Sequence, residues 1–192
     1  MARRKIQFES GKCYHIYNRG CNKENIFLNE DNYQYLIRLF SKNIKTFNVT
    51  IIAYCLMPNH YHLLLRQNND IGLDRFIQSV FNSYTKAFNK MHSRSGTLFE
   101  GPYRNIVVND DIYLSHLCRY IHRNPLDAGL VKDIRRWKYS NYPEWIETRN
   151  GRLVDYDFIK VYFKTSGEYE EFVNDYTPLK KLNKGLEKYL LE

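Results

Sequence analysis

The sequence has few cysteines and lacks a long apolar run. Its four cysteines, Cys13, Cys21, Cys55 and Cys118, do not form the Cys-x-x-Cys spacing typical of structural zinc sites. No apolar stretch approaches the ~20 residues that span a bilayer, and no hydrophobic segment follows the basic residues 1–5. Internal repeats and low-complexity segments are also absent from the sequence. We therefore expect a cytoplasmic protein with reduced thiols and no membrane partner.

What the sequence does contain is positive charge and aromatic residues. The 192 residues carry a formal net charge of +8, and aromatics make up 16% of them, including 17 tyrosines. A basic surface attracts phosphate, and exposed rings stack on unpaired bases, so this composition favours a nucleic-acid partner, although a basic protein with a tyrosine-rich core would share it. The length fits one main core. We expect a catalytic domain over residues 1–146 and a mainly helical extension over 147–192.

The hydrophobic periodicity predicts an alternating order of strands and helices. Strands are expected at 13–18, 49–56, 60–66 and 103–108, and helices at 31–46 and 73–91. A third helix should begin near Asp110 and end before Pro125. The order is that of the split βαβ, or ferredoxin-like, layout. We predict an α+β fold with helices on one face of an antiparallel sheet, and the other face free for single-stranded nucleic acid.

Two pairs of residues are candidates for chemistry. On a strand, His60 and His62 project from the same side with Cα atoms ~7 Å apart, so both imidazoles can bind one divalent cation. Tyr120 and Asn124 lie one helical turn apart, which offers a nucleophile and an amide ligand. Taken singly, each has an ordinary explanation: surface histidines, a core tyrosine and a helix-ending asparagine. Their combination in a basic chain is much less common.

Cleavage of a phosphodiester needs a nucleophile and positive charge near the non-bridging oxygens. Tyr120 can supply the first and a bound cation the second. A free phenol has a pKa of ~10, so the tyrosine needs help from a base or from the cation. A phosphotyrosine would conserve the energy of the ester bond and allow strands to be rejoined without ATP. For two imidazoles and an amide oxygen, Mg²⁺ or Mn²⁺ is favoured over Zn²⁺.

These motifs also carry a family resemblance. Residues 54–65 (YCLMPNHYHLLL) resemble the His-hydrophobic-His segment of the single-tyrosine transposases of bacterial insertion sequences, and residues 120–131 (YIHRNPLDAGLV) resemble the nucleophile helix of the same family. Asn four residues after the tyrosine is typical of the branch associated with repetitive extragenic palindromes (REP). The similarity extends to 14–20 (YHIYNRG) and 96–104 (GTLFEGPYR), and spans about residues 8–145.

The resemblance implies a ferredoxin-like domain that nicks single-stranded DNA near a hairpin, forming a 5′-phosphotyrosine and releasing a 3′-hydroxyl. It implies Tyr120 as the nucleophile, with His60, His62 and Asn124 as metal ligands. The protein would act as a monomer or homodimer. Two positions depart from the family pattern. Tyr61 stands where an aliphatic residue is usual, and Pro102 stands where a basic residue is expected.

Basic residues near these motifs are candidate DNA contacts, of which we expect about half to touch phosphate. The candidates are Arg19, Lys86, Lys90, His92, Arg94, Arg104 and Arg123.

There are two alternatives to a nickase. One is a catalytically silent regulatory protein that binds DNA hairpins and descends from such a transposase. The other is a rolling-circle initiator or relaxase, which the small size, the single tyrosine motif after the histidines and the lack of a helicase segment disfavour.

Overall fold

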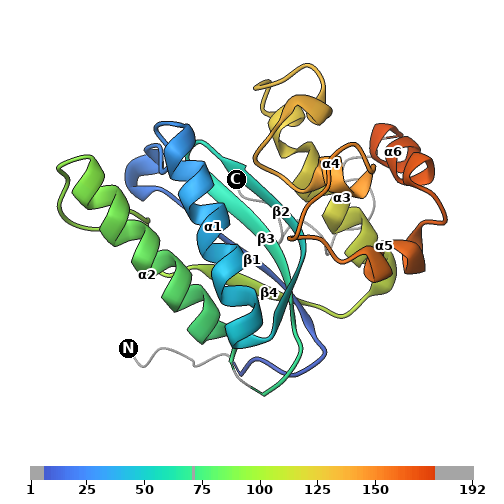
Figure 1. The fold of residues 1–192 in the computed structure, drawn as a ribbon, viewed down its shortest axis with the longest axis horizontal. Coiled ribbons are helices and arrows are strands. Elements are labelled where there is room, and N and C mark those ends of the chain that lie inside the picture. Colours follow the sequence, from blue (N-terminus) through green and yellow to red (C-terminus); the bar gives the residue numbers. More distant parts are fainter. Residues whose placement is uncertain (1–6, 71, 176–192) are drawn as a thin grey trace.

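A computed structural model describes residues 7–70 and 72–175 of the chain. Its centre is an antiparallel four-stranded sheet of order β2-β3-β1-β4 (Figure 1). The strands are β1 (Cys13–Arg19), β2 (Val49–Met57), β3 (His60–Gln67) and β4 (Arg104–Val108). The helices are α1 (Glu30–Phe47), α2 (Leu73–Met91), α3 (Asp111–Asp127), α4 (Tyr142–Trp145), α5 (Tyr156–Tyr162) and α6 (Ser166–Asn174), with short 3-10 turns at Cys21–Lys23 and Ile134–Arg136. The predicted α+β, ferredoxin-like class is confirmed.

Helices α1 and α2 cover one face of the sheet, as the periodicity predicts. Leu36 and Phe40 of α1 and Phe76 of α2 pack in one apolar cluster against the side chains that β3 directs to this face. The side chain of Asn29 caps α1 by accepting a hydrogen bond from the Asn32 amide. Because α1 and α2 cover this face, the apolar side chains of β3 point toward it, and the alternate residues of β3 point to the other face.

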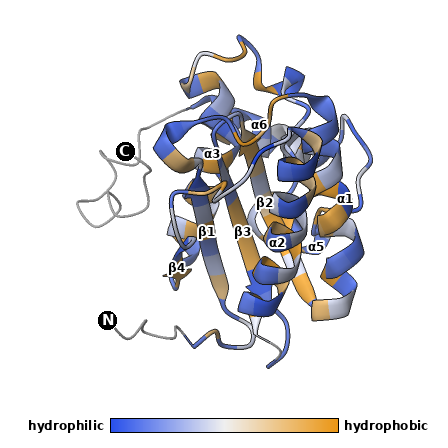
Figure 2. Ribbon diagram, turned by 90° about the vertical axis from the view of Figure 1, so that its left-hand side faces the viewer, coloured by the Kyte–Doolittle hydropathy of each residue, from blue (hydrophilic) through white to orange (hydrophobic). Residues whose placement is uncertain are grey.

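The opposite face of the sheet is not free, so this part of the prediction is wrong. It is covered by α3 and the C-terminal helices (Figure 1), and Leu117 and Ile121 of α3 pack against Cys55 of β2 in a second apolar cluster. Figure 2 shows hydrophobic stretches along β3, which lies between the two layers of helices. The physical reason is visible in the sequence. Residues 51–57 (IIAYCLM) are apolar throughout instead of alternating, which is typical of a strand buried on both faces.

The C-terminal extension belongs to this second cluster. Phe158 of α5 and Tyr169 of α6 pack with α3 and α4. The segment after Gly129 contains the second 3-10 turn and α4. The part of the predicted extension at 176–192 lies outside the described residues. Within 7–70 and 72–175, no helix is long and apolar enough to cross a membrane.

Helix α3 continues through Pro125, contrary to the prediction that it ends before this residue. Pro125 is buried in the last turn, where the loss of one backbone donor affects only the helix end. The helix ends at Asp127. Gly129 follows with a φ of 69°, in the left-handed region, and its amide donates to the Leu126 carbonyl. The continuation keeps Asn124 inside the helix, one turn from Tyr120.

Candidate active site

Strand β3 presents His60 and His62 to α3. Successive side chains alternate between faces, so Tyr61 and Leu63 join the cluster under α1 and α2 while both histidines face the other way. The two imidazole centroids are 5.1 Å apart. His62 is fully buried, whereas His60 is half-buried at the start of the strand.

Tyr120 and Asn124 approach this pair from α3. The Tyr120 ring lies edge-on to His62, with centroids 5.4 Å apart. The Asn124 Oδ1 atom is 3.5 Å from His60 Nε2. The structure thus brings together all four residues that the sequence predicts for the catalytic and metal site, and it does so within one chain.

A chain of hydrogen bonds determines which nitrogen of His60 faces the site. The Asn59 amide nitrogen donates to the Lys23 carbonyl at 3.2 Å, so the Asn59 Oδ1 atom is directed to His60 Nδ1, 2.7 Å away. An amide oxygen only accepts, so His60 Nδ1 carries the proton. His60 Nε2 is then left with its lone pair. Sequence analysis did not identify Asn59, which precedes His60 directly.

Asn124 is oriented in a similar way. Its Nδ2 atom donates to the Tyr120 carbonyl at 2.9 Å, which turns Oδ1 toward His60 Nε2. Two acceptor atoms therefore face each other without a proton between them. A cation bound by both atoms would convert this unfavourable arrangement into a favourable one.

His62 offers a further donor atom. Its Nδ1 atom lies 3.0 Å from Nε2 of His15, a fully buried residue of β1. Its Nε2 atom is also buried and has no hydrogen-bond partner among the described residues. A buried polar atom without a partner costs free energy, which is consistent with a site that a ligand completes. His15 and the stacked Tyr17 were not identified as site residues, although both lie in the segment 14–20 singled out above.

Electrostatics favour neutral imidazoles at this position. Burial lowers the pKa of His60, and the nearby Arg19 lowers it further, while the contact with Asn124 opposes this effect. The pKa of His62 is held well below its ordinary value by burial first, and then by His15 and His60. Neutral imidazoles have the lone pairs that metal coordination requires.

Two imidazole nitrogens and an amide oxygen form a donor set that suits Mn²⁺ or Mg²⁺ and leaves positions for water and phosphate oxygens. In the part of the chain that the structure describes, no cluster of three His, Cys, Asp or Glu side chains is arranged for a metal. Among the described residues, the amide of Asn124 is the candidate for a third protein ligand beside the two histidines.

A small polar cavity of about 220 Å³ lies at the ends of β1 and β4, and its lining includes Tyr17 and Arg19, which pair in register with His62 and His60. The loop before β4 closes it, because the Asn18 amide donates to the Gly101 carbonyl at 3.0 Å and Arg19 is paired with Glu100. The cavity is lined by Tyr17, Asn18, Arg19, Glu100, Gly101, Pro102 and Arg104. Two predicted DNA contacts, Arg19 and Arg104, thus line this cavity, together with the proline that departs from the family pattern.

The other predicted DNA contacts are placed elsewhere. Lys86 and Lys90 are exposed on α2, on the far side of the sheet from α3. At the end of this helix, His92 contacts the Asn32 side chain at 3.3 Å. There too, Arg94 donates to the Thr97 carbonyl at 3.4 Å and lies 3.7 Å from Glu24.

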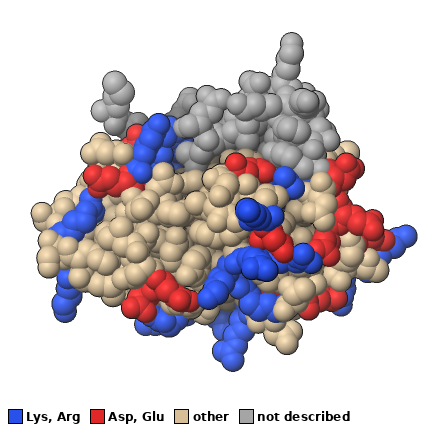
Figure 3. Space-filling view, turned by 90° about the horizontal axis from the view of Figure 1, so that it is seen from above, with Lys and Arg blue, Asp and Glu red and all other residues tan. Residues whose placement is uncertain are grey.

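Arg123 is turned toward the C-terminal helices rather than toward the histidines. Its guanidinium donates to the Val173 carbonyl at 2.9 Å and pairs with Asp127 at 3.1 Å. Seen from above, Lys and Arg side chains lie in several groups with Asp and Glu between them (Figure 3). The predicted contacts therefore do not form one basic patch, and only Arg19 and Arg104 border the candidate site.

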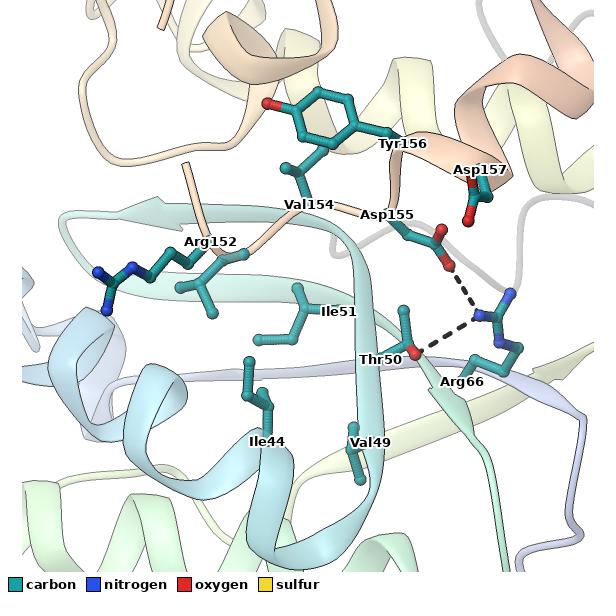
Figure 4. A pocket seen from close by; sticks show the side chains of 11 residues that line it. Ile44, Val49, Thr50, Ile51, Arg66, Arg152, Val154, Asp155, Tyr156 and Asp157 are labelled. Atoms are coloured by element: carbon teal, nitrogen blue, oxygen red, sulfur yellow. Dashed lines mark hydrogen bonds and ion pairs between the residues drawn. The ribbon is translucent and has the colours of Figure 1, made fainter. Parts of the chain in front are cut away.

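A second cavity, of about 540 Å³, lies at the opposite end of β3 (Figure 4). Arg66 crosses its edge and pairs with Asp155 at 2.7 Å. Arg66 is six positions from His60, which on a strand corresponds to about 20 Å. None of the described residues that line this cavity belongs to the predicted site.

A sheet that presents two histidines to a tyrosine on a neighbouring helix is the arrangement expected of a single-tyrosine transposase. The family model described as "Transposase IS200 like" matches residues 10–124, and the chain belongs to this family.

The chain is also similar to two individual proteins described as REP-associated transposases. A putative REP-associated tyrosine transposase of Haemophilus influenzae is 27% identical over 101 residues, which are 47% of this chain and 57% of the relative. The solved structure of a REP-associated tyrosine transposase bound to a REP hairpin has a similar fold, with a TM-score of 0.64 at 17% identity. That match covers 81% of this chain and 94% of the solved one.

Proposed function

We propose that the protein is a transposase-type endonuclease that nicks and rejoins single-stranded DNA beside hairpins or palindromic repeats. The observation that carries this proposal is the position of Tyr120 beside His62, while Asn124 faces His60. Membership of the IS200-like transposase family supports DNA processing. The hairpin bound by the structural relative supports a hairpin as the substrate.

In the proposed reaction Tyr120 is the nucleophile. Its phenol oxygen bonds to the phosphorus as the bond to the 3′ oxygen breaks, and the phenol loses its proton. The departing oxygen takes up a proton and leaves as a 3′-hydroxyl, while the 5′ end stays on the tyrosine as a phosphodiester. In the reverse step a 3′-hydroxyl attacks the phosphotyrosine and rejoins a strand without ATP.

His60, His62 and Asn124 would hold a divalent cation, Mg²⁺ or Mn²⁺. When bound, the cation supplies positive charge for the non-bridging phosphate oxygens. The residues of the chain prepare this site. Burial keeps the two imidazoles neutral, and Asn59 directs the lone pair of His60 toward Asn124. One turn of α3 sets the distance between the amide ligand and the nucleophile.

The cavity beside the site is the proposed path for the DNA strand. Arg19 and Arg104 flank it and would neutralise phosphates, whereas Lys86, Lys90, His92 and Arg94 would contact DNA further away. Because the nucleophile and the histidines meet within one chain, no residue of a second copy is needed, and we propose that a monomer acts in the cytoplasm. Arg123, held by α6 and Asp127, would support α3 rather than bind DNA.

The proposal is tested by an assay for covalent protein–DNA adducts. The protein is mixed with labelled single-stranded hairpin oligonucleotides from around its own gene, with Mn²⁺ or Mg²⁺ and with chelator. We expect a protease-sensitive, slowly migrating band that needs metal and is lost in Tyr120→Phe and His60→Ala. Tyr162→Phe is the matched control, because this half-buried tyrosine bonds to Asp111 away from the site. Hairpin binding without any adduct would favour the silent regulatory protein instead.

A further inference from the structure

His15 is a buried histidine in contact with the candidate metal site. It lies on β1, diagonally across from His62 of β3, since the register pairs His15 with Leu64 and Tyr17 with His62. Both histidines have zero exposure, and their rings stack with centroids 5.2 Å apart. The His15 Nε2 atom lies 3.0 Å from His62 Nδ1. The other ring nitrogen of His15, Nδ1, is buried and has no hydrogen-bond partner among the described residues.

The hydrogen bond between His15 Nε2 and His62 Nδ1 contains one proton. The ring that carries this proton determines whether Nε2 of His62 can bind a cation. If His15 donates, the neutral His62 carries its own proton on Nε2, and that atom has no lone pair for a cation. If His62 donates from Nδ1, its Nε2 atom, which is buried and has no hydrogen-bond partner among the described residues, has the lone pair that a cation needs. The second arrangement requires His15 Nε2 to be an acceptor.

We propose that His15 is a positioning residue that accepts the Nδ1 proton of His62 and thereby presents Nε2 of His62 to the cation. This inference rests on the metal site of the proposed function. Histidine ligands in metal sites generally donate their second ring nitrogen to a partner that fixes the ring and its tautomer, and the loss of such a partner typically costs 10–100-fold in affinity. Tyr17 holds His15 in place by stacking on it at 4.7 Å.

The inference is tested by titrating Mn²⁺ into the DNA-free protein and following the free ion by electron paramagnetic resonance. His15→Leu fills the space but cannot accept a hydrogen bond, and should bind Mn²⁺ about 10–100-fold more weakly. His15→Gln can place an amide oxygen near the position of Nε2 and should restore most of the affinity. His122→Leu is the matched control, because His122 is also fully buried but bonds to Asn141 and Tyr169 instead. It should lose stability and keep its Mn²⁺ affinity.

Long-range ¹H–¹⁵N spectra of the metal-free protein give a second, independent reading. In the wild type His62 should be protonated on Nδ1, and His15→Leu should shift it toward the Nε2-protonated form. Unchanged Mn²⁺ affinity in His15→Leu, with binding still lost in His62→Ala, would overturn the role of His15 and leave the metal site standing. If the wild type binds no Mn²⁺, the proposed metal site fails, and an Nε2-protonated His62 would then overturn the role of His15 as well.

Discussion

Acidification should weaken this fold through His122, the buried histidine between Tyr120 and Asn124 on α3. Its Nε2 atom donates to Asn141 Oδ1 at 2.9 Å, and its Nδ1 atom accepts from the Tyr169 hydroxyl at 2.6 Å. The neutral ring is therefore fully satisfied. Burial lowers the pKa of His122 from its ordinary 6.5 to about 4, although the bond to Asn141 opposes this change. His122 therefore binds a proton less readily in the folded protein than in the unfolded chain.

The size of the effect follows from the two pKa values. Above about pH 6.5 neither state is protonated, and the stability is full. As the pH falls from about 6.5 to about 4, the unfolded chain takes up a proton and the folded one does not, so folding becomes less favourable. At 1.36 kcal/mol per pH unit, this interval corresponds to a loss of about 3 kcal/mol from His122 alone.

Urea unfolding, followed by tryptophan fluorescence at several pH values between about 7.5 and 4, measures this loss. His122→Gln removes the titrating ring. We expect it to be about 1–3 kcal/mol less stable than the wild type near neutral pH, because buried hydrogen bonds are lost. The two stability curves should converge as the pH falls, since only the wild type has this group to protonate. Carboxylates titrate in both proteins and cancel in the difference. Parallel curves over the whole range would refute the argument.

Three further predictions follow from the same structure. Asn141→Ala should lower the free energy of unfolding by about 3 kcal/mol in urea titrations, because its amide bonds to two backbone carbonyls and a backbone amide of the core; a loss below about 1 kcal/mol would contradict this. Asn124→Asp should tighten Mn²⁺ binding by about tenfold through the added charge, whereas Asn124→Ala should weaken it, and equal affinities would argue against Asn124 as a ligand. Arg104→Ala should weaken hairpin binding and reduce the salt dependence by about one phosphate contact in filter-binding assays, while Lys160→Ala, an exposed change on α5, should leave both unchanged.

Most of the fold could be predicted because its signals are local. Apolar spacing places α2 at the predicted residues, and the two-residue connection at Pro58 and Asn59 fixes the antiparallel pairing of β2 with β3. Strand alternation likewise places both histidines on one face. The error concerned the other face of the sheet, where the unbroken apolar run of β2 was a signal that the prediction did not use. The prediction that α3 ends before Pro125 was wrong because the local preference of proline is overridden by its burial in the last turn of the helix.

The chemistry of the site was less accessible, because it depends on contacts between distant segments. Periodicity predicts the face on which a side chain lies, but not the neighbour that receives its proton. His15 contacts His62 because β1 pairs with β3 in one particular register. Arg123 points away from the histidines because α6 packs against α3, where the Val173 carbonyl accepts its hydrogen bond. Asn59 is adjacent to His60 in sequence, yet its effect depends on the carbonyl of Lys23, which holds the amide in one orientation. Sequence patterns could therefore identify the four residues of the candidate site, whereas the protonation of its two imidazoles required the positions of their hydrogen-bond partners.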